Sequence, residues 1–175
     1  IYMLDFPKTG TTWLLNNLMS HPDIDYRGIK ENYYPVRYGL PMMEYTNYYK
    51  PYDISLNFCP SIWACDSKIL IELNTVTTHW SIGLRNPYDL INSIYNFMIQ
   101  NGRSTEDNRA LDLLNVELRH YKNIISRLKK YIKRDITVLF YDELQKNPQV
   151  YLNRVLDYLN VSRILVTNID TINPT

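Results

Sequence analysis

The sequence predicts an α/β fold in three layers, in which helices flank a central parallel β-sheet. Short β-prone runs alternate with helical patterns along the chain, as they do when crossover helices join parallel strands. Hydrophobic residues make up 45% and charged residues 21% of the sequence, a balance typical of a globular protein with a core. A chain of 175 residues is long enough for one sizeable core, so we expect residues 1–175 to form a single domain.

The first half of the chain contains three strand candidates, one helix and one ambiguous run. The apolar run at 1–6 is the first strand, and the spacing of apolar residues predicts a helix over 11–20. Residues 24–29 form a possible second strand, and residues 79–85 alternate as a strand with one buried face does. The run ILIEL at 69–73 fits either a buried strand or a helix.

The second half contains three helices and one strand. The pair Asn-Pro, at 86–87 and again at 147–148, supplies the preferred N-cap and first residue of a helix. We expect the first of these helices to end at Gly102. Another helix is predicted from about 104 to 134, and the β-prone run ITVLF at 136–140 is the last strand.

Two segments have compositions that admit a functional interpretation, although a structural one is preferred for both. Half of the 16 tyrosines lie at 26–52 among several prolines, which indicates an irregular loop that packs its rings on the core. The alternative is an acceptor-binding wall, because tyrosine offers a flat face with a polar tip. Seven basic residues and no acidic ones lie at 119–134, which favours a solvated helix face over a site for an anionic polymer.

Charge and hydropathy exclude several classes of protein. The net charge is +1, so no overall field attracts the chain to nucleic acid or to a membrane surface. No apolar run approaches the roughly 18 residues that span a bilayer, and no basic-then-apolar signal segment begins the sequence. Two cysteines, Cys59 and Cys65, are too few for a disulfide framework and indicate reduced thiols. We therefore expect a cytoplasmic protein.

The turn PKTGTT joins the first strand to the first helix and has the composition of a phosphate-binding loop. Backbone N–H groups without partners and the positive end of the helix dipole gather at such a turn. Gly10 would let the backbone approach an anion, Lys8 adds a positive charge, and Thr9, Thr11 and Thr12 add hydroxyl donors. A capped helix without a ligand would explain one threonine but not the whole set.

The turn differs from the loop that binds nucleoside triphosphates. That signature, G-x-x-x-x-G-K-[ST], places lysine after the second glycine and a Mg²⁺-binding hydroxyl next to it. Here Lys8 precedes the only glycine of the turn. A nucleotide kinase-like phosphotransferase is therefore a weaker alternative, and a non-catalytic nucleotide- or polyanion-binding module is another.

A second motif, LRNPYDLINSIY, follows the strand at 79–85. Arg85 ends that strand, and ligands bind at the carboxyl ends of the strands in open α/β sheets. Its planar guanidinium suits a phosphate. Ser93 lies about two turns into the next helix, where serine is an indifferent helix former and a hydrogen-bonding role is plausible. A surface arginine and a packed serine are the alternatives.

Three segments together resemble the sulfotransferases that use 3'-phosphoadenosine 5'-phosphosulfate (PAPS). They are PKTGTTW, LRNPYDLINSIY and VLFYDELQKNPQVYLNRVLDYLNV, and they occur in the family's order over residues 1–161. The resemblance implies a P-loop-like fold and transfer of a sulfuryl group from PAPS to a hydroxyl or amine of a carbohydrate or small molecule. The product would be 3'-phosphoadenosine 5'-phosphate (PAP), and no metal ion is expected.

The resemblance also assigns the donor-binding residues. The loop over 8–12 would hold the 5'-phosphosulfate, with Lys8 on the leaving phosphate, while Arg85 and Ser93 would hold the 3'-phosphate. Trp13 and Tyr141 match family residues near the adenine. A core tryptophan and a strand-end tyrosine are the alternatives.

The resemblance further points to a carboxylate as the catalytic base. The run HPDIDYRGIKENYYP resembles the carbohydrate and tyrosyl branches of the family, in which a glutamate precedes an aromatic pair. Glu31 occupies that position and is the expected base. The histidine of the cytosolic branch has no counterpart. We expect structural roles for His21, His79 and His120.

Two departures from the family pattern limit what the resemblance assigns. The family usually has a basic, glycine-containing segment near the C-terminus that holds the 3'-phosphate, whereas RILVTNIDTINPT contains only Arg163, so either the chain is trimmed or another residue substitutes. The chain also combines a tryptophan typical of the cytosolic branch with a glutamate typical of the carbohydrate branch. The acceptor is therefore not assigned from the sequence.

Overall fold

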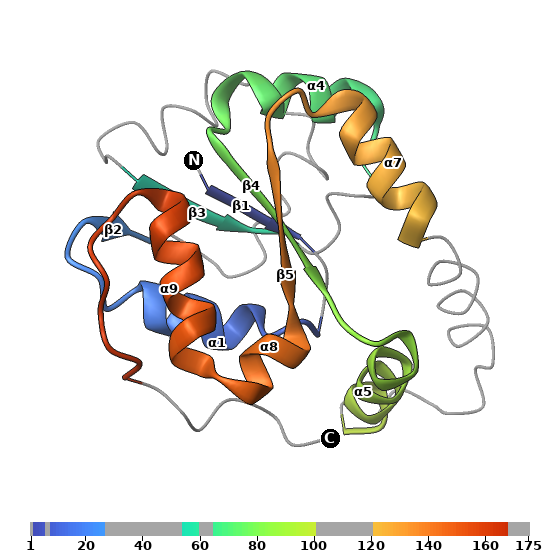
Figure 1. The fold of residues 1–175 in the computed structure, drawn as a ribbon. Helices are drawn as coiled ribbons and strands as arrows, with labels where there is room; N and C mark the ends of the chain where they lie inside the picture. Colours follow the sequence, from blue (N-terminus) through green and yellow to red (C-terminus); the bar gives the residue numbers. More distant parts are fainter. Residues whose placement is uncertain (1, 6–7, 27–53, 60–64, 101–120, 168–175) are drawn as a thin grey trace.

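The residues that the structure describes form a five-stranded sheet in which every pair of neighbouring strands is parallel (Figure 1). The strand order is β2-β3-β1-β4-β5. With helices on both faces, this arrangement confirms the three-layer α/β fold that the alternating sequence pattern predicts. The computed structural model describes residues 2–5, 8–26, 54–59, 65–100 and 121–167.

The strands are short, and their carboxyl ends meet at one edge of the sheet. The central strand β1 (Tyr2–Asp5) lies between β3 (Ile54–Phe58) and β4 (His79–Leu84), with β2 (Ile24–Asp25) and β5 (Ile136–Phe140) at the two sides. Because the strands are parallel, the loops that follow them lie along the same edge. This edge carries the candidate site.

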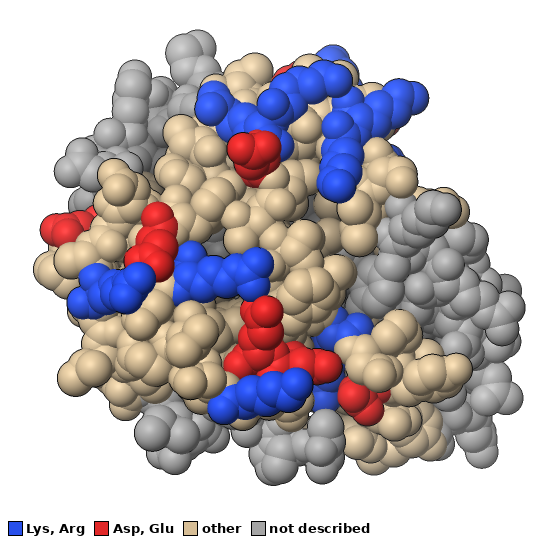
Figure 2. All heavy atoms as spheres, viewed as in Figure 1, with Lys and Arg blue, Asp and Glu red and all other residues tan. Residues whose placement is uncertain are grey.

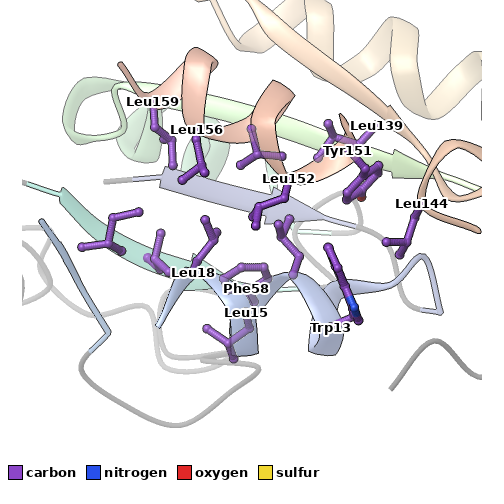
Figure 3. Packing of buried hydrophobic residues seen from close by; sticks show 14 of the residues in the cluster. Trp13, Leu15, Leu18, Phe58, Leu139, Leu144, Tyr151, Leu152, Leu156 and Leu159 are labelled. Carbon is purple, nitrogen blue, oxygen red and sulfur yellow. The ribbon is translucent and has the colours of Figure 1, made fainter. Parts of the chain in front are cut away.

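Two groups of helices cover the two faces of the sheet. Helices α1 (Thr11–Leu18), α8 (Tyr141–Lys146) and α9 (Pro148–Leu159) share one buried cluster with β3 and β5. Figure 3 shows side chains of α1 and α9 meeting in that cluster. Helices α4 (Ser67–Val76) and α7 (Tyr121–Tyr131) pack on the other face, against β4. The structure thus buries a core on each side of the sheet.

The helix boundaries follow the capping signals in the sequence. Helix α5 (Pro87–Gln100) begins after Asn86, whose Oδ1 accepts a hydrogen bond from the backbone N–H of Tyr88 at 3.0 Å. Helix α9 begins after Asn147, whose Oδ1 accepts from the backbone N–H of Val150 at 3.2 Å. Both helices that the Asn-Pro pairs predict are confirmed.

The structure settles one ambiguous element and adds one strand that the sequence predictions lack. The ambiguous run at 69–73 lies inside α4, where Leu70 and Leu73 are buried one turn apart. Strand β3 is absent from the sequence predictions although ISLNF at 54–58 alternates between apolar and polar residues, and in the structure the polar Ser55 and Asn57 are buried as well. The alternation is typical of a strand with one buried face, but it does not show that the polar face is buried too.

Other predictions are met only within the described ranges. Helix α7 lies in the described part of the helix predicted over 104–134 and ends at Tyr131. Strand β2 lies at the start of the strand predicted at 24–29, of which residues 27–29 are outside the described ranges. Cys59 and Cys65 are buried thiols that form no disulfide with each other. Within the described ranges, no helix combines the length and the apolar character that a membrane crossing requires.

Candidate active site

The loop between β1 and α1 places a helix N-terminus at the carboxyl edge of the sheet. The N-cap of α1 is Gly10, which has no side chain to accept a hydrogen bond from the first turn. Helix α4 differs, since Asp66 caps it by accepting a hydrogen bond from the backbone N–H of Lys68 at 2.7 Å. Of the first two residues of α1, Thr11 is half-buried and Thr12 is exposed. Backbone N–H groups and hydroxyls at this end of α1 suit an anion.

Gly10 is required by both its backbone conformation and its packing. Its φ of 83° lies in the left-handed region, which L-residues other than glycine rarely adopt. A Cβ atom at this position would lie 2.4 Å from Cδ2 of Leu144, the buried leucine of α8. The glycine therefore lets the loop pack directly against α8.

Thr9 is anchored on β4 rather than presented to solvent. Its side chain is buried, and a Cβ atom added to Gly83 would lie only 2.3 Å from its Oγ1. The role of Thr9 as a hydroxyl donor in the phosphate loop stays a prediction, and its side chain lies buried against β4. Gly83 was missed, although an isolated glycine inside a strand often marks a close backbone approach.

Lys8 has an unusual backbone conformation and a defined side-chain direction. Its φ is 59°, in the left-handed region, and its carbonyl oxygen accepts a hydrogen bond from Nη1 of Arg85 at 3.2 Å. Its Nζ lies 3.8 Å from the centroid of the Phe97 ring on α5. The two sequence motifs are therefore brought together, as the parallel sheet predicts.

Arg85 follows β4 and is 7% exposed. The centre of its guanidinium lies 4.2 Å from the centroid of the buried Tyr141 ring, so the tyrosine supports the arginine. Among the described residues, Nε of Arg85 has no hydrogen-bond partner. A bound anion would stabilise a buried cation of this kind, because burying a charge without a partner is unfavourable.

A pocket of about 240 Å³ lies beside this arginine, between the ends of β4 and β5. It is lined by Leu84, Arg85, Asn86, Pro87, Phe140 and Asp142.

Ser93 lies eight residues after Arg85 on α5 and is half-buried. It precedes Phe97 by four residues, so both lie on the same face of the helix. Because Phe97 contacts Lys8, this face is directed toward the phosphate loop. Ser93 therefore lies on the face of α5 that is turned toward Lys8.

Trp13 is placed in the core. Its ring has no exposed surface and meets Tyr151 edge-on, with 6.0 Å between the ring centroids (Figure 3). Stacking on an adenine would require an open ring face, and Trp13 presents none here. The core interpretation that the sequence left open is the one that the structure supports.

The candidate bases differ in where they lie. Glu31 and His120 are outside the described residues. His79 begins β4, at the amino edge of the sheet, and six residue steps of about 3.3 Å each separate it from Arg85. Partial burial lowers the pKa of His79, with the positive charge of Arg134 contributing. The position of His79 therefore excludes it as a base for this site.

His21 has the structural role expected of it. The ring is buried, and its Nε2 lies 2.8 Å from the carbonyl oxygen of Ser162. The backbone N–H of Asp23 donates to its Nδ1 at 3.1 Å. These contacts attach the segment after α9 to the end of α1. Among the described residues, no group of three or more His, Cys, Asp or Glu side chains could hold a metal ion.

The basic face of α7 lies away from the site. Lys129, Lys130 and Lys133 are exposed near the end of α7, which leads into the start of β5. Figure 2 shows blue side chains gathered over this part of the molecule. The start of β5 is at the amino edge of the sheet, so this basic group is at the end opposite Lys8 and Arg85. Its position favours the solvated face over a donor or acceptor site.

Comparison with solved structures identifies the fold. A crystal structure of a sulfotransferase from Alicyclobacillus acidocaldarius is 18% identical, with 97% of this chain and 84% of that chain covered and a TM-score of 0.76. The sulfotransferase domain from the curacin biosynthetic pathway is 16% identical, with 92% and 73% covered and a TM-score of 0.61. The prediction of a P-loop-like sulfotransferase fold is therefore confirmed.

Comparison at the level of sequence identifies the family. No curated protein matches the chain significantly. The profile of the family described as "Sulfotransferase domain" matches residues 1–172. The chain therefore belongs to the sulfotransferase domain family.

Proposed function

We propose that this protein transfers a sulfuryl group from PAPS to a hydroxyl or amine of an acceptor, either a carbohydrate or a small molecule. Membership of the family implies a sulfuryl-transfer enzyme, and the family generally uses PAPS and releases PAP. The observation that carries the proposal is the hydrogen bond between Arg85 and the Lys8 carbonyl. It places two cationic residues from separate motifs at one edge of the sheet, as a donor with two phosphate-bearing ends requires.

We also propose that residues 1–175 form a single domain.

The donor would lie along the carboxyl edge. Lys8, the N-terminus of α1 and the hydroxyls of Thr11 and Thr12 would bind the 5'-phosphosulfate. Arg85 and Ser93 would bind the 3'-phosphate. Tyr141 would act through Arg85, because its ring lies against the guanidinium. Trp13 is left out of this set because its ring is closed to a ligand.

The reaction exchanges one bond to sulfur for another. The acceptor oxygen or nitrogen attacks sulfur in line, and the bond between sulfur and the bridging phosphate oxygen breaks. The electron pair of that bond leaves with the 5'-phosphate of PAP, where the charge of Lys8 stabilises it. Glu31 is the proposed base that accepts the proton of the acceptor. The lower charge of a sulfuryl group makes a metal ion less necessary than it is in phosphoryl transfer.

Radiolabelled PAPS tests the proposal. The protein is incubated with [³⁵S]PAPS and a panel of simple phenols, sugars and amines, and the label in each acceptor and the PAP formed are both measured. We expect label in at least one acceptor class, with one PAP released for each sulfated product. Tight binding of PAP with no transfer to any class would instead indicate a non-catalytic nucleotide-binding module.

A further inference from the structure

The ammonium group of Lys8 lies over the ring of Phe97, which stands outside the two core clusters that the described residues form. Its Nζ is 3.8 Å from the centroid of Phe97, well inside the range of a cation–π contact. Phe97 is 43% exposed and belongs to neither buried cluster of the sheet. The cation–π contact with Lys8, and not the exposure of the ring, is the observation that suggests a role for Phe97.

We propose that Phe97 is a positioning residue that holds the Lys8 ammonium in place for the 5'-phosphosulfate. The inference rests on the proposed function, because it concerns the residue that would stabilise the leaving phosphate. Phe97 acts through Lys8 and need not touch the donor itself.

Three features of the structure fix Lys8. Its φ of 59° sets the direction in which the side chain leaves the loop. Nη1 of Arg85 holds its carbonyl oxygen at 3.2 Å. The Phe97 ring then fixes the end of the side chain. A lysine otherwise samples many rotamers, and ordering it when the donor binds would reduce the affinity that its charge provides.

A ring is better suited to this task than an acidic side chain. A carboxylate beside Lys8 would form an ion pair, and an incoming phosphate would have to compete with it. The ring attracts the ammonium through its quadrupole but carries no net charge. The ring itself therefore does not neutralise the positive charge of Lys8.

The experiment compares two nucleotides that differ only in the 5'-phosphate. Isothermal titration calorimetry measures the affinity of PAP and of adenosine 3'-monophosphate for the wild type and for Phe97→Leu, Phe97→Tyr, Lys8→Ala and the Lys8→Ala/Phe97→Leu double variant. Ile99→Ala is the matched control, because Ile99 is a similarly exposed apolar residue on α5.

We expect Phe97→Leu to weaken PAP binding about two- to fivefold and to leave adenosine 3'-monophosphate binding unchanged. Phe97→Tyr and Ile99→Ala should behave as the wild type. In the Lys8→Ala background, Phe97→Leu should have no further effect, because the ring then has no ammonium to hold.

Three outcomes would overturn the inference. Equal weakening of both nucleotides would mean that Phe97 supports the site in general, and unchanged PAP binding would mean that the ring does not position Lys8. Additive effects in the double variant would show that Phe97 acts independently of Lys8. If the wild type itself bound no PAP, the proposed function would fail together with this inference, whereas the other outcomes leave that function standing.

Discussion

The guanidinium of Arg85 donates a hydrogen bond to the backbone carbonyl oxygen of Lys8, with 3.2 Å between Nη1 and the oxygen. The two residues are 77 positions apart in the sequence. The bond fixes the loop after β1 relative to the end of β4. A substitution of Arg85 is therefore expected to weaken donor binding in two ways, by removing its direct contact and by releasing the loop.

Replacing Arg85 should reduce selectivity for the 3'-phosphate. A charge-assisted hydrogen bond contributes about 1.5–3 kcal/mol, so Arg85→Ala should weaken PAPS binding roughly ten- to hundredfold. Adenosine 5'-phosphosulfate, which lacks the 3'-phosphate, should lose much less, and only through the loop. Competition binding with both nucleotides measures the difference. Equal losses for the two would remove the 3'-phosphate role from Arg85.

Replacing Lys8 should affect catalysis more than binding. Lys8→Ala removes the charge that faces the leaving phosphate, where negative charge increases as the bond to sulfur breaks. Turnover should therefore fall by a larger factor than donor affinity. Steady-state kinetics with the best acceptor from the panel, together with PAP calorimetry, separate the two. A variant with normal turnover and weaker PAP binding would make Lys8 a binding residue only.

Replacing Glu31 should affect catalysis alone. Glu31→Gln keeps the size of the side chain but cannot accept the acceptor proton, so turnover should fall by about 10²–10⁴-fold. PAP affinity should stay near that of the wild type, in contrast with Lys8→Ala. Near-normal turnover would show that the base is elsewhere. Lost PAP binding would mean instead that the segment around Glu31 forms part of the nucleotide pocket.

The sequence predicts the general arrangement of the site better than the details of its packing. The Asn-Pro pairs, the glycine of the loop and the arginine at a strand end are local signals, and each predicts a position correctly. The burial of Trp13 and the contact of Phe97 with Lys8 depend on how α1, α5 and α9 pack, which no local pattern contains. The burial of Asn57 in β3 is likewise determined by its surroundings and not by its residue type.

Gly83 provides a stability test of that packing. A Cβ atom at this position would lie 2.3 Å from Oγ1 of Thr9, so Gly83→Ala forces the loop away from β4. Overpacking of this kind costs about 1–3 kcal/mol in the free energy of unfolding, and PAP affinity should fall as the loop shifts. Denaturant unfolding and PAP calorimetry measure both. The Gly83→Ala/Thr9→Ala double variant should recover part of the lost stability, and wild-type stability in Gly83→Ala alone would refute the close contact.

The most direct test of the central claim is a thermal unfolding series with PAP and with ATP plus Mg²⁺. A ligand that binds the folded state raises the melting temperature of the protein. At a hundred times its dissociation constant, the ligand adds about 2.7 kcal/mol to the free energy of unfolding. The account predicts that PAP raises the melting temperature without Mg²⁺ and that ATP with Mg²⁺ has little effect at the same concentration. Stabilisation by ATP with Mg²⁺ and not by PAP would contradict the account and indicate a phosphotransferase.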